Sequence, residues 1–129
     1  MSVFFNNSAN WDHVSHSGGA ILIYRGVAIF SACYFVQNFA RDKGGALTTT
    51  KYRTVIFHSC NFTGNRIKGH ISHEYNTIIV AETGGGAIHI ENIKNINISN
   101  SFFGDNKAFR DGGAIQLQCW KYKQRILLL

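Results

Sequence analysis

One short motif occurs four times in this sequence, and its repetition constrains the fold more than any other feature. Gly-Gly-Ala followed by Ile or Leu begins at residues 18, 44, 85 and 112. The starts are separated by 26, 41 and 27 residues. A repeat of this length is typical of solenoid proteins, in which each unit forms one coil that contacts only its neighbours.

A second motif, Phe-x-x-Asn, alternates with the first. From the first glycine of a copy to the next motif phenylalanine the distance is 17, 18 and 18 residues. From the motif asparagine to the next glycine pair it is six residues after Asn38 and Asn106, but twenty after Asn65. We therefore expect an inserted loop within residues 66–83. Insertions at a fixed corner of a repeat often form the binding face of a solenoid.

Hydrophobic residues within each unit alternate with a period of two, which predicts β-strands. Over residues 85–91, Ile88 and Ile90 face one side of the strand and His89 the other. The same alternation over residues 112–118 predicts a buried Leu117 between exposed glutamines. A second strand precedes each motif phenylalanine. Two strands and three bends in about 27 residues fit one coil of a parallel β-helix.

The repeated residues have structural roles in such a coil. Stacked asparagines tolerate left-handed backbone at a bend and can hydrogen-bond along the stack. The phenylalanines are expected to stack inside, each ring adding well over ~1 kcal/mol through burial. The glycine pairs let the chain turn with room for neighbouring coils. The structural positions are Gly18, Gly19, Gly44, Gly45, Gly85, Gly86, Gly112, Gly113, Phe4, Phe35, Phe62, Phe103, Asn7, Asn38, Asn65 and Asn106.

These paired motifs resemble the chlamydial polymorphic outer-membrane protein repeat over roughly residues 2–118. The resemblance implies an all-β, right-handed parallel β-helix of the pectin-lyase-like kind, with about four coils in residues 1–118. It also implies a non-enzymatic structural or adhesive module of a cell-surface or secreted protein. Members of the family are longer, so we expect a fragment. Residues 119–129 then form a tail, which either covers the last coil or remains an exposed strand.

Composition and charge narrow the class of partner. Hydrophobic residues make up 45% of the chain and charged residues 16%, as in an ordered domain. The net charge of +6 favours an acidic partner, but the basic residues are scattered, so nucleic acid is not an expected partner. No apolar run approaches the ~20 residues of a membrane span. Residues 1–7 show no secretory signal, so surface localisation rests on the resemblance.

Cysteine and histidine residues are candidates for a disulfide or for metal binding. Cys33 and Cys60 occupy one column, where adjacent coils would place their Cα atoms about 5 Å apart, within disulfide range. Parallel in-register side chains seldom reach the torsion of a disulfide, so a buried pair of thiols is favoured.

Two pairs of histidines have the three-residue spacing of metal ligands on a helix: His13 with His16, and His70 with His73 in the inserted loop. Neither segment is predicted to be a helix. We expect no metal and no cofactor.

A polysaccharide lyase or hydrolase of the same fold is the alternative function. Such enzymes need clustered carboxylates on one outer face. Asp42 and Asp111 lie near one corner, yet on coils separated by an intervening one, about 10 Å apart. With Arg41 and Arg110 alongside, this is expected to be a solvated corner. No catalytic residue is assigned.

A specific contact is therefore expected from residues outside the repeat. The inserted loop carries the candidate interaction residues Arg66, Lys68, His70, His73, Glu74 and Tyr75. The expected partner is a protein or glycan ligand at a surface. The open ends of a solenoid also predict end-to-end self-association.

Overall fold

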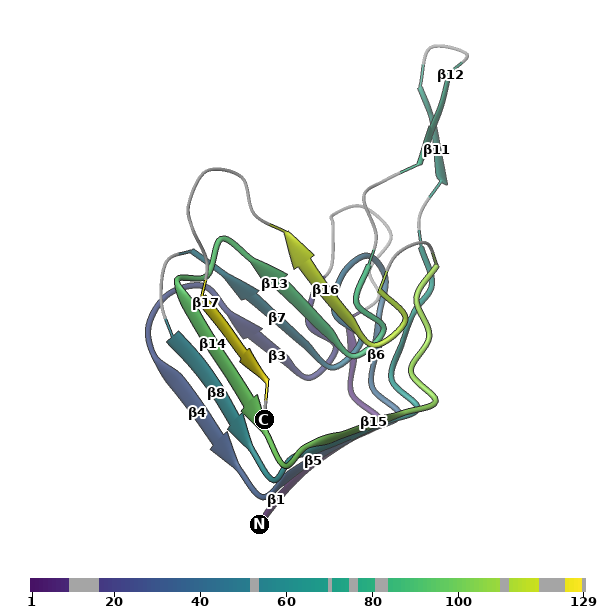
Figure 1. The fold of residues 1–129 in the computed structure, drawn as a ribbon. Coiled ribbons are helices and arrows are strands. Elements are labelled where there is room, and N and C mark those ends of the chain that lie inside the picture. The colour runs from purple at the N-terminus through teal and green to yellow at the C-terminus, as the bar shows by residue number, and fades with distance from the viewer. Residues whose placement is uncertain are drawn as a thin grey trace.

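The computed structural model describes residues 1–9, 17–51, 54–69, 71–74, 77–80, 84–109, 112–118 and 125–128. These residues form 17 β-strands, of which all but one pair belong to stacked coils (Figure 1). Within these ranges the structure has no helix long and apolar enough to span a membrane.

Each coil contributes strands in the same order. The first coil contains β1 (Ser2–Phe5), β2 (Ser8–Ala9), β3 (Ile21–Ile23) and β4 (Ala28–Ser31). The second contains β5 (Cys33–Val36), β6 (Phe39–Ala40), β7 (Leu47–Thr50) and β8 (Thr54–His58). The third contains β9 (Asn61–Thr63), β10 (Arg66–Ile67), β13 (Ile88–Glu91) and β14 (Asn95–Ser99). The fourth contains β15 (Phe102–Gly104), β16 (Ile115–Gln118) and β17 (Arg125–Leu128).

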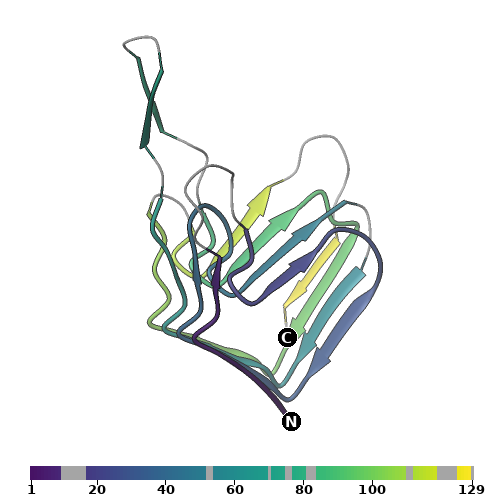
Figure 2. The same ribbon diagram turned by 180° about the vertical axis from the view of Figure 1, so that it is seen from behind.

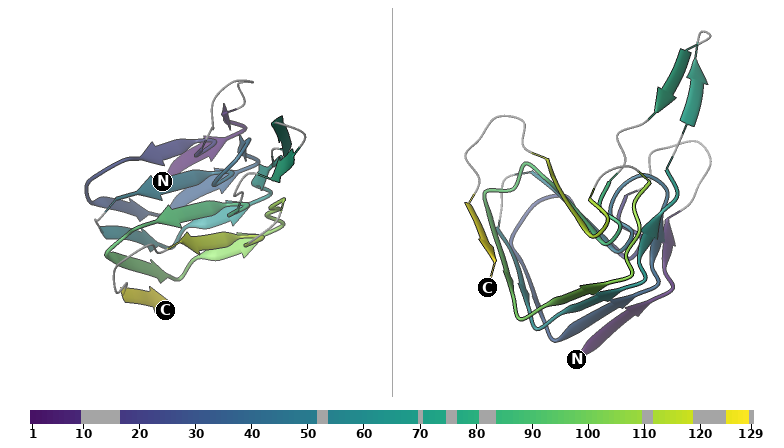
Figure 3. Two further views of the ribbon diagram at one scale, coloured as in Figure 1. Left: turned by 90° about the horizontal axis from the view of Figure 1, so that it is seen from above. Right: turned by 45° about the vertical axis from the view of Figure 1, so that its right-hand side comes forward.

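Equivalent strands of successive coils pair in parallel and form four sheets. In chain order they are the first sheet (β1-β5-β9-β15), the second (β2-β6-β10), the third (β3-β7-β13-β16) and the fourth (β4-β8-β14-β17). The pairing aligns Phe4 with Phe35, and Phe62 with both Phe35 and Phe103. Figure 3 (left) shows the strands stacked along one axis, with the two termini at opposite ends. The prediction of a parallel β-helix of about four coils is confirmed.

The sequence undercounted the strands of each coil. Each motif phenylalanine lies in a strand of the first sheet, where a bend was predicted. Arg66 and Ile67 continue the second sheet, so the coil extends at least two residues into the predicted insertion at 66–83. At the other end, β17 pairs with β14 in parallel register and forms the last wall of the fourth coil. Part of the tail at 119–129 therefore continues the solenoid.

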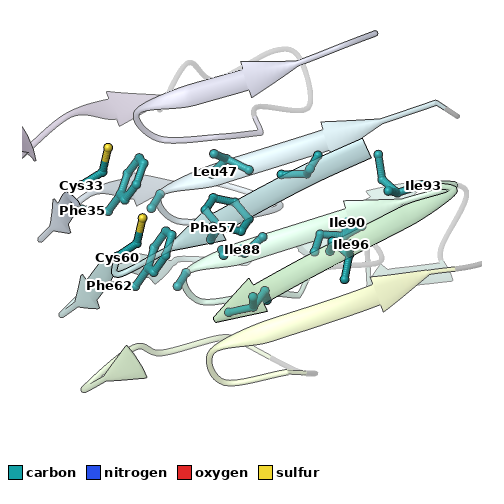
Figure 4. Close-up of a cluster of buried hydrophobic side chains, with 14 residues drawn as sticks. Cys33, Phe35, Leu47, Phe57, Cys60, Phe62, Ile88, Ile90, Ile93 and Ile96 are labelled. Carbon is teal, nitrogen blue, oxygen red and sulfur yellow. The ribbon is translucent and has the colours of Figure 1, made fainter. Parts of the chain in front are cut away.

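The core lies between the first, third and fourth sheets (Figure 2). The predicted aromatic stack is present: successive ring centroids from Phe4 to Phe103 are 4.7, 4.6 and 4.7 Å apart, with nearly parallel planes. A second stack, of Phe30 on Phe57, meets the first stack edge to face. Figure 4 shows Phe35 and Phe62 beside the Leu47 and Ile88 side chains of the third sheet. Burial of these rings stabilises the inner coils, together with the aliphatic side chains of the same cluster.

The asparagines form a hydrogen-bonded ladder, as predicted. In each step the backbone N–H and side-chain Nδ2 of one asparagine donate to Oδ1 of the asparagine in the following coil, at 2.9–3.0 Å. Nδ2 of Asn38, Asn65 and Asn106 also donates to the carbonyl of the motif phenylalanine one coil earlier. Asn38 and Asn65 are fully buried, and these bonds satisfy their amides.

The left-handed residue at this bend is not the asparagine that the sequence suggested. It is the preceding residue in every coil, with φ of 52° at Asn6, 54° at Gln37, 66° at Gly64 and 54° at Asp105. The asparagine instead turns its amide inward to the ladder, which leaves the preceding side chain on the outside of the corner.

The glycine pairs have the predicted role, and the second glycine is the more constrained by packing. A Cβ at Gly19, Gly45 or Gly86 would lie 2.1 Å from the carbonyl oxygen of the second glycine in the next coil. Successive coils can approach only because these residues lack a side chain.

Two burial predictions for the third sheet are wrong. His89 is buried, although the alternation placed it on the outside. His89 Nδ1 shares a 2.8 Å hydrogen bond with Gln116 Oε1 of the neighbouring strand β16. Thr48, the equivalent residue of the second coil, is also buried and donates to the Lys43 carbonyl. Leu117 faces the interior but is 40% exposed, because β16 is the outer strand of its sheet.

Candidate ligand-binding groove

A groove of about 470 Å³ runs along the outside of the bend between the first and second sheets. Residues from all four coils line it. They are Asn6, Gln37, Gly64, Arg66, Asp105 and Lys107. We call this the axial groove, because it crosses the coils in the direction in which they stack.

The local sequence of each bend creates the axial groove. The left-handed residue of each coil faces outward, behind it lies the asparagine ladder, and the next residue begins the second sheet. Gly64 provides open space in the centre, since a Cβ there would find only the Gln37 side chain, at 3.5 Å. The groove is thus lined by side chains at non-repeated positions on a repeated backbone.

Hydrogen bonds between coils fix the backbone of the groove. Gln37 N donates to the Thr63 carbonyl at 2.9 Å, and Gly64 N donates to the Gly104 carbonyl at 3.0 Å. On the other wall, Lys107 N donates to the Asn65 carbonyl at 2.9 Å. Such a site is pre-formed, so a ligand would not have to order its backbone.

Two cations lie side by side on the wall of the axial groove. Arg66 and Lys107 form a parallel bridge between adjacent coils, which places their backbones about 4.8 Å apart. Both side chains are exposed, and neither has an ion-pair partner among the described residues. The Arg66 guanidinium lies 5.7 Å from the ring centroid of Phe39. Adjacent like charges repel each other, so an anion bound between them would be favoured.

An apolar surface adjoins the axial groove on the outer side of the first sheet. We call it the aromatic face. Its exposed members are Val3, Phe5, Tyr34 and Phe102. Asn61 and Thr63, which are hydrogen-bonded to each other, interrupt it on the third coil. The aromatic face and the axial groove together present aromatic rings, amides and a hydroxyl beside two cations.

The structure separates the predicted interaction residues into two groups. Arg66 lies in β10, and Lys68 is the first residue after this strand, so both belong to the coil. His73 and Glu74 lie in β11 (Ile71–Glu74), which pairs antiparallel with β12 (Thr77–Val80) in a hairpin that extends away from the coils (Figure 1). His70 and Tyr75 lie outside the described residues. Of the described members of the predicted set, Arg66 alone lines the axial groove, and the sequence did not indicate Lys107 or Asp105 as its neighbours.

Cys33 and Cys60 are buried, free thiols on adjacent coils (Figure 4). The Cys60 thiol donates to the carbonyls of Phe30 and His58, both at 3.4 Å. Burial raises the pKa of Cys60. A protonated, inaccessible thiol is a packing residue rather than a nucleophile.

The carboxylates and histidines do not assemble a second site in the described part of the chain. Asp42 is buried, which corrects the expectation of a solvated corner. Four other residues of the predicted corner and histidine pair lie outside the described residues: Asp111, Arg110, His13 and His16. Among described residues, no group of three His, Cys, Asp or Glu side chains could hold a metal ion.

The fold is that of a parallel β-solenoid, a class of proteins in which each sequence repeat forms one coil. Residues 2–24 match the family model of the Chlamydia polymorphic membrane protein repeat. The match spans β1 to β3 and includes the first copy of each motif. No curated protein and no solved structure matches the chain. The three later coils repeat both motifs and pair in register with the matched one.

Proposed function

We propose that this chain is a non-enzymatic adhesive module of a cell-surface repeat protein, and that it binds an acidic glycan along the axial groove. The observation that carries the proposal is the pair of adjacent cations, Arg66 and Lys107, without acidic partners among the described residues. The match of residues 2–24 to a repeat of membrane proteins supports the surface location.

The chemistry of the groove favours a saccharide carrying carboxylate or sulfate groups. Arg66 can bind a carboxylate through two parallel hydrogen bonds, and Lys107 adds a second positive charge. The amides of Asn6 and Gln37 can both donate to and accept from sugar hydroxyls. Asp105, on the fourth coil, can accept hydrogen bonds from sugar hydroxyls. The groove crosses all four coils, about 15 Å, which suits an extended chain rather than a compact ligand.

An oligosaccharide array tests this proposal. The labelled chain should bind acidic oligosaccharides, such as oligogalacturonate, more strongly than neutral oligosaccharides of equal length. The double variant Arg66→Ala, Lys107→Ala should lose at least about tenfold in affinity, since it removes both charge-assisted contacts. The matched control, Arg25→Ala with Lys94→Ala, removes the same charge from exposed positions outside the groove and should bind as before.

Three results would contradict parts of the proposal. Equal loss of binding in both double variants would indicate net charge rather than the groove. Equal binding of polyglutamate would show that the saccharide itself is not recognised. Loss of binding on deletion of residues 70–83, with the groove intact, would move the contact to the hairpin of β11 and β12.

The rival enzymatic function requires a pair of carboxylates at the reacting bond. Asp105 is the one carboxylate in the axial groove lining, so the groove itself does not provide that pair. Incubation with acidic polysaccharides should yield no unsaturated products and no new reducing ends. Turnover that is abolished by Asp42→Ala or Asp111→Ala would favour the enzyme instead.

A further inference from the structure

The two ends of the asparagine ladder have opposite hydrogen-bonding character. In every step the donors lie on the earlier coil and Oδ1 on the later coil. At the N-terminal end, Asn7 Oδ1 accepts from no described residue. At the C-terminal end, the backbone N–H of Asn106 donates to no described acceptor, and its Nδ2 reaches only back to the Phe62 carbonyl. An acceptor therefore remains at one end, and donors remain at the other.

The apolar interior is also less covered at both ends of the described part of the solenoid. Among the partly buried hydrophobic residues that pack on the core, those of the first coil are Phe4, Ala20, Ile21, Ile23 and Phe30, and those of the last coil are Phe103 and Ile115. No such residue comes from the two inner coils. β1, β3 and β4 are the outer strands of their sheets at one end, as β15, β16 and β17 are at the other. Outer strands present unpaired backbone groups that another strand can bind.

Gly113 provides an independent observation. At Gly19, Gly45 and Gly86 a Cβ would collide with the carbonyl of the next coil at 2.1 Å. At Gly113 the nearest described atom to a Cβ is the Asn106 carbonyl oxygen, at 3.8 Å, which is an ordinary contact. Within the chain the described residues give Gly113 no reason to be glycine. A coil stacked beyond it would require glycine.

We propose that copies of this chain stack head to tail, with the fourth coil of one copy on the first coil of the next. Asn106 of one copy donates to Asn7 Oδ1 of the other, which continues the ladder. Phe103 stacks on Phe4, and Gly113 accommodates the Gly19 carbonyl. The occupant is a second copy because its first coil supplies an acceptor, a ring and a glycine that continue the three columns of the fourth coil, in the register that the chain uses internally.

This interface is heterologous, because the two surfaces in contact are different. Association in this mode need not close, so the expected product is a series of short oligomers rather than a dimer alone. The net charge of +6 on each copy opposes association, and salt should therefore strengthen it. The axial groove lies on the side of the coils, so this inference does not depend on glycan binding.

Sedimentation equilibrium of the full chain tests the proposal. The average mass should rise between about 10 μM and about 1 mM, the range in which weak contacts become populated. Gly113→Ala should remain monomeric over that range, with an unchanged circular dichroism spectrum and a melting temperature no lower than that of the original chain. Gly64→Ala is the control on the side of the solenoid, where there is room for a Cβ. Its left-handed φ of 66° should cost about 1 kcal/mol in stability, but the variant should associate like the original chain.

Cross-linking defines the geometry of the contact. Ser2 and Ser101 occupy the Cys33–Cys60 column at opposite ends. In a Cys119→Ser background, Ser2→Cys and Ser101→Cys chains should form mixed dimers with a short thiol cross-linker, and neither alone should do so. A monomer at all concentrations and salt conditions would overturn the proposal. So would undiminished association of Gly113→Ala, or cross-linking of Ser2→Cys chains with each other.

Discussion

The inner and end coils of this protein contain the same repeated residues in different surroundings. Phe35 and Phe62 are completely buried, with a ring stacked on each side. Phe4 and Phe103 occupy the same column but have a ring on one side only and are partly exposed. The contribution of a repeated residue is therefore set by its neighbouring coils and not by the motif itself. Solenoids in general gain much of their stability from such interfaces between neighbouring repeats.

The largest expected difference between inner and end coils concerns the second glycine. Gly86→Ala places a Cβ 2.1 Å from the Gly113 carbonyl and 2.6 Å from the backbone of Lys107. Because backbone cannot give way cheaply, we expect a loss of more than about 5 kcal/mol and no cooperative urea transition. Gly113→Ala should instead be neutral or up to about 1 kcal/mol more stable, since alanine restricts the unfolded chain. Equal destabilisation of the two would contradict the comparison.

The aromatic stack should show a smaller difference of the same sign. Phe62→Ala removes a fully buried ring and should cost about 3–5 kcal/mol in the free energy of unfolding. Phe103→Ala removes a partly exposed ring and should cost about half as much. Urea titrations monitored by circular dichroism measure both values. A cost for Phe103→Ala as large as that for Phe62→Ala would mean that the end coil is buried in solution, as head-to-tail stacking would produce at high concentration.

The ladder provides a polar version of the same test. Asn65→Ala leaves the Asn38 backbone N–H and the Phe35 carbonyl without their buried partner. Orphaned buried groups cost about 1–3 kcal/mol each, so a loss of about 3 kcal/mol is expected. Asn7→Ala removes one part-buried hydrogen bond, from Asn7 Nδ2 to Asn38 Oδ1. Asn38 Oδ1 still accepts from the backbone N–H of residue 7, so the cost should be less than about 1 kcal/mol. If chemical denaturation gives the two variants similar stability, the ladder is not a structural element of the inner coils.

The smallest expected effect is a pH dependence at the Cys60 column. The pKa of Cys60 is raised by burial, so the folded chain holds this proton more tightly than the unfolded chain. Its contribution is present below the ordinary thiol value of 9.0 and is lost as the pH rises through the raised pKa. As the pH rises from about 8 to about 10, the urea concentration at the midpoint of unfolding should fall less in Cys60→Ala than in the original chain. Ser101→Ala, the change at the equivalent end-coil position, should leave the slope unaltered.

Much of the fold follows from residue spacing. The repeated motifs and the period of two predicted stacked parallel strands, the aromatic column, the asparagine ladder and the role of the glycines. The predicted insertion falls within the third coil, between β10 and β13, although Arg66 and Ile67 of the predicted range remain in the coil. These features are readable because each depends on residues close together in the chain or on the regular interval between repeats.

The candidate site was not readable in the same way. The sequence directed attention to the inserted segment, yet the axial groove joins Arg66 to Lys107, which lies 41 residues later and is adjacent only because coils stack. Its other walls come from residues that precede the ladder asparagines, which the sequence had not distinguished from ordinary bend residues. Similarly, His89 is buried against the next coil, where it shares a hydrogen bond with Gln116 of β16.

By itself the sequence determined the coil, its internal register and the residues that stack within it, because a regular interval brings identical residues into one column. Only the tertiary structure decided which face of each coil is covered, where the groove lies and how far the end coils are exposed. Those properties depend on the contacts of one coil with another, and the same motif has different contacts in the middle of the stack and at its ends.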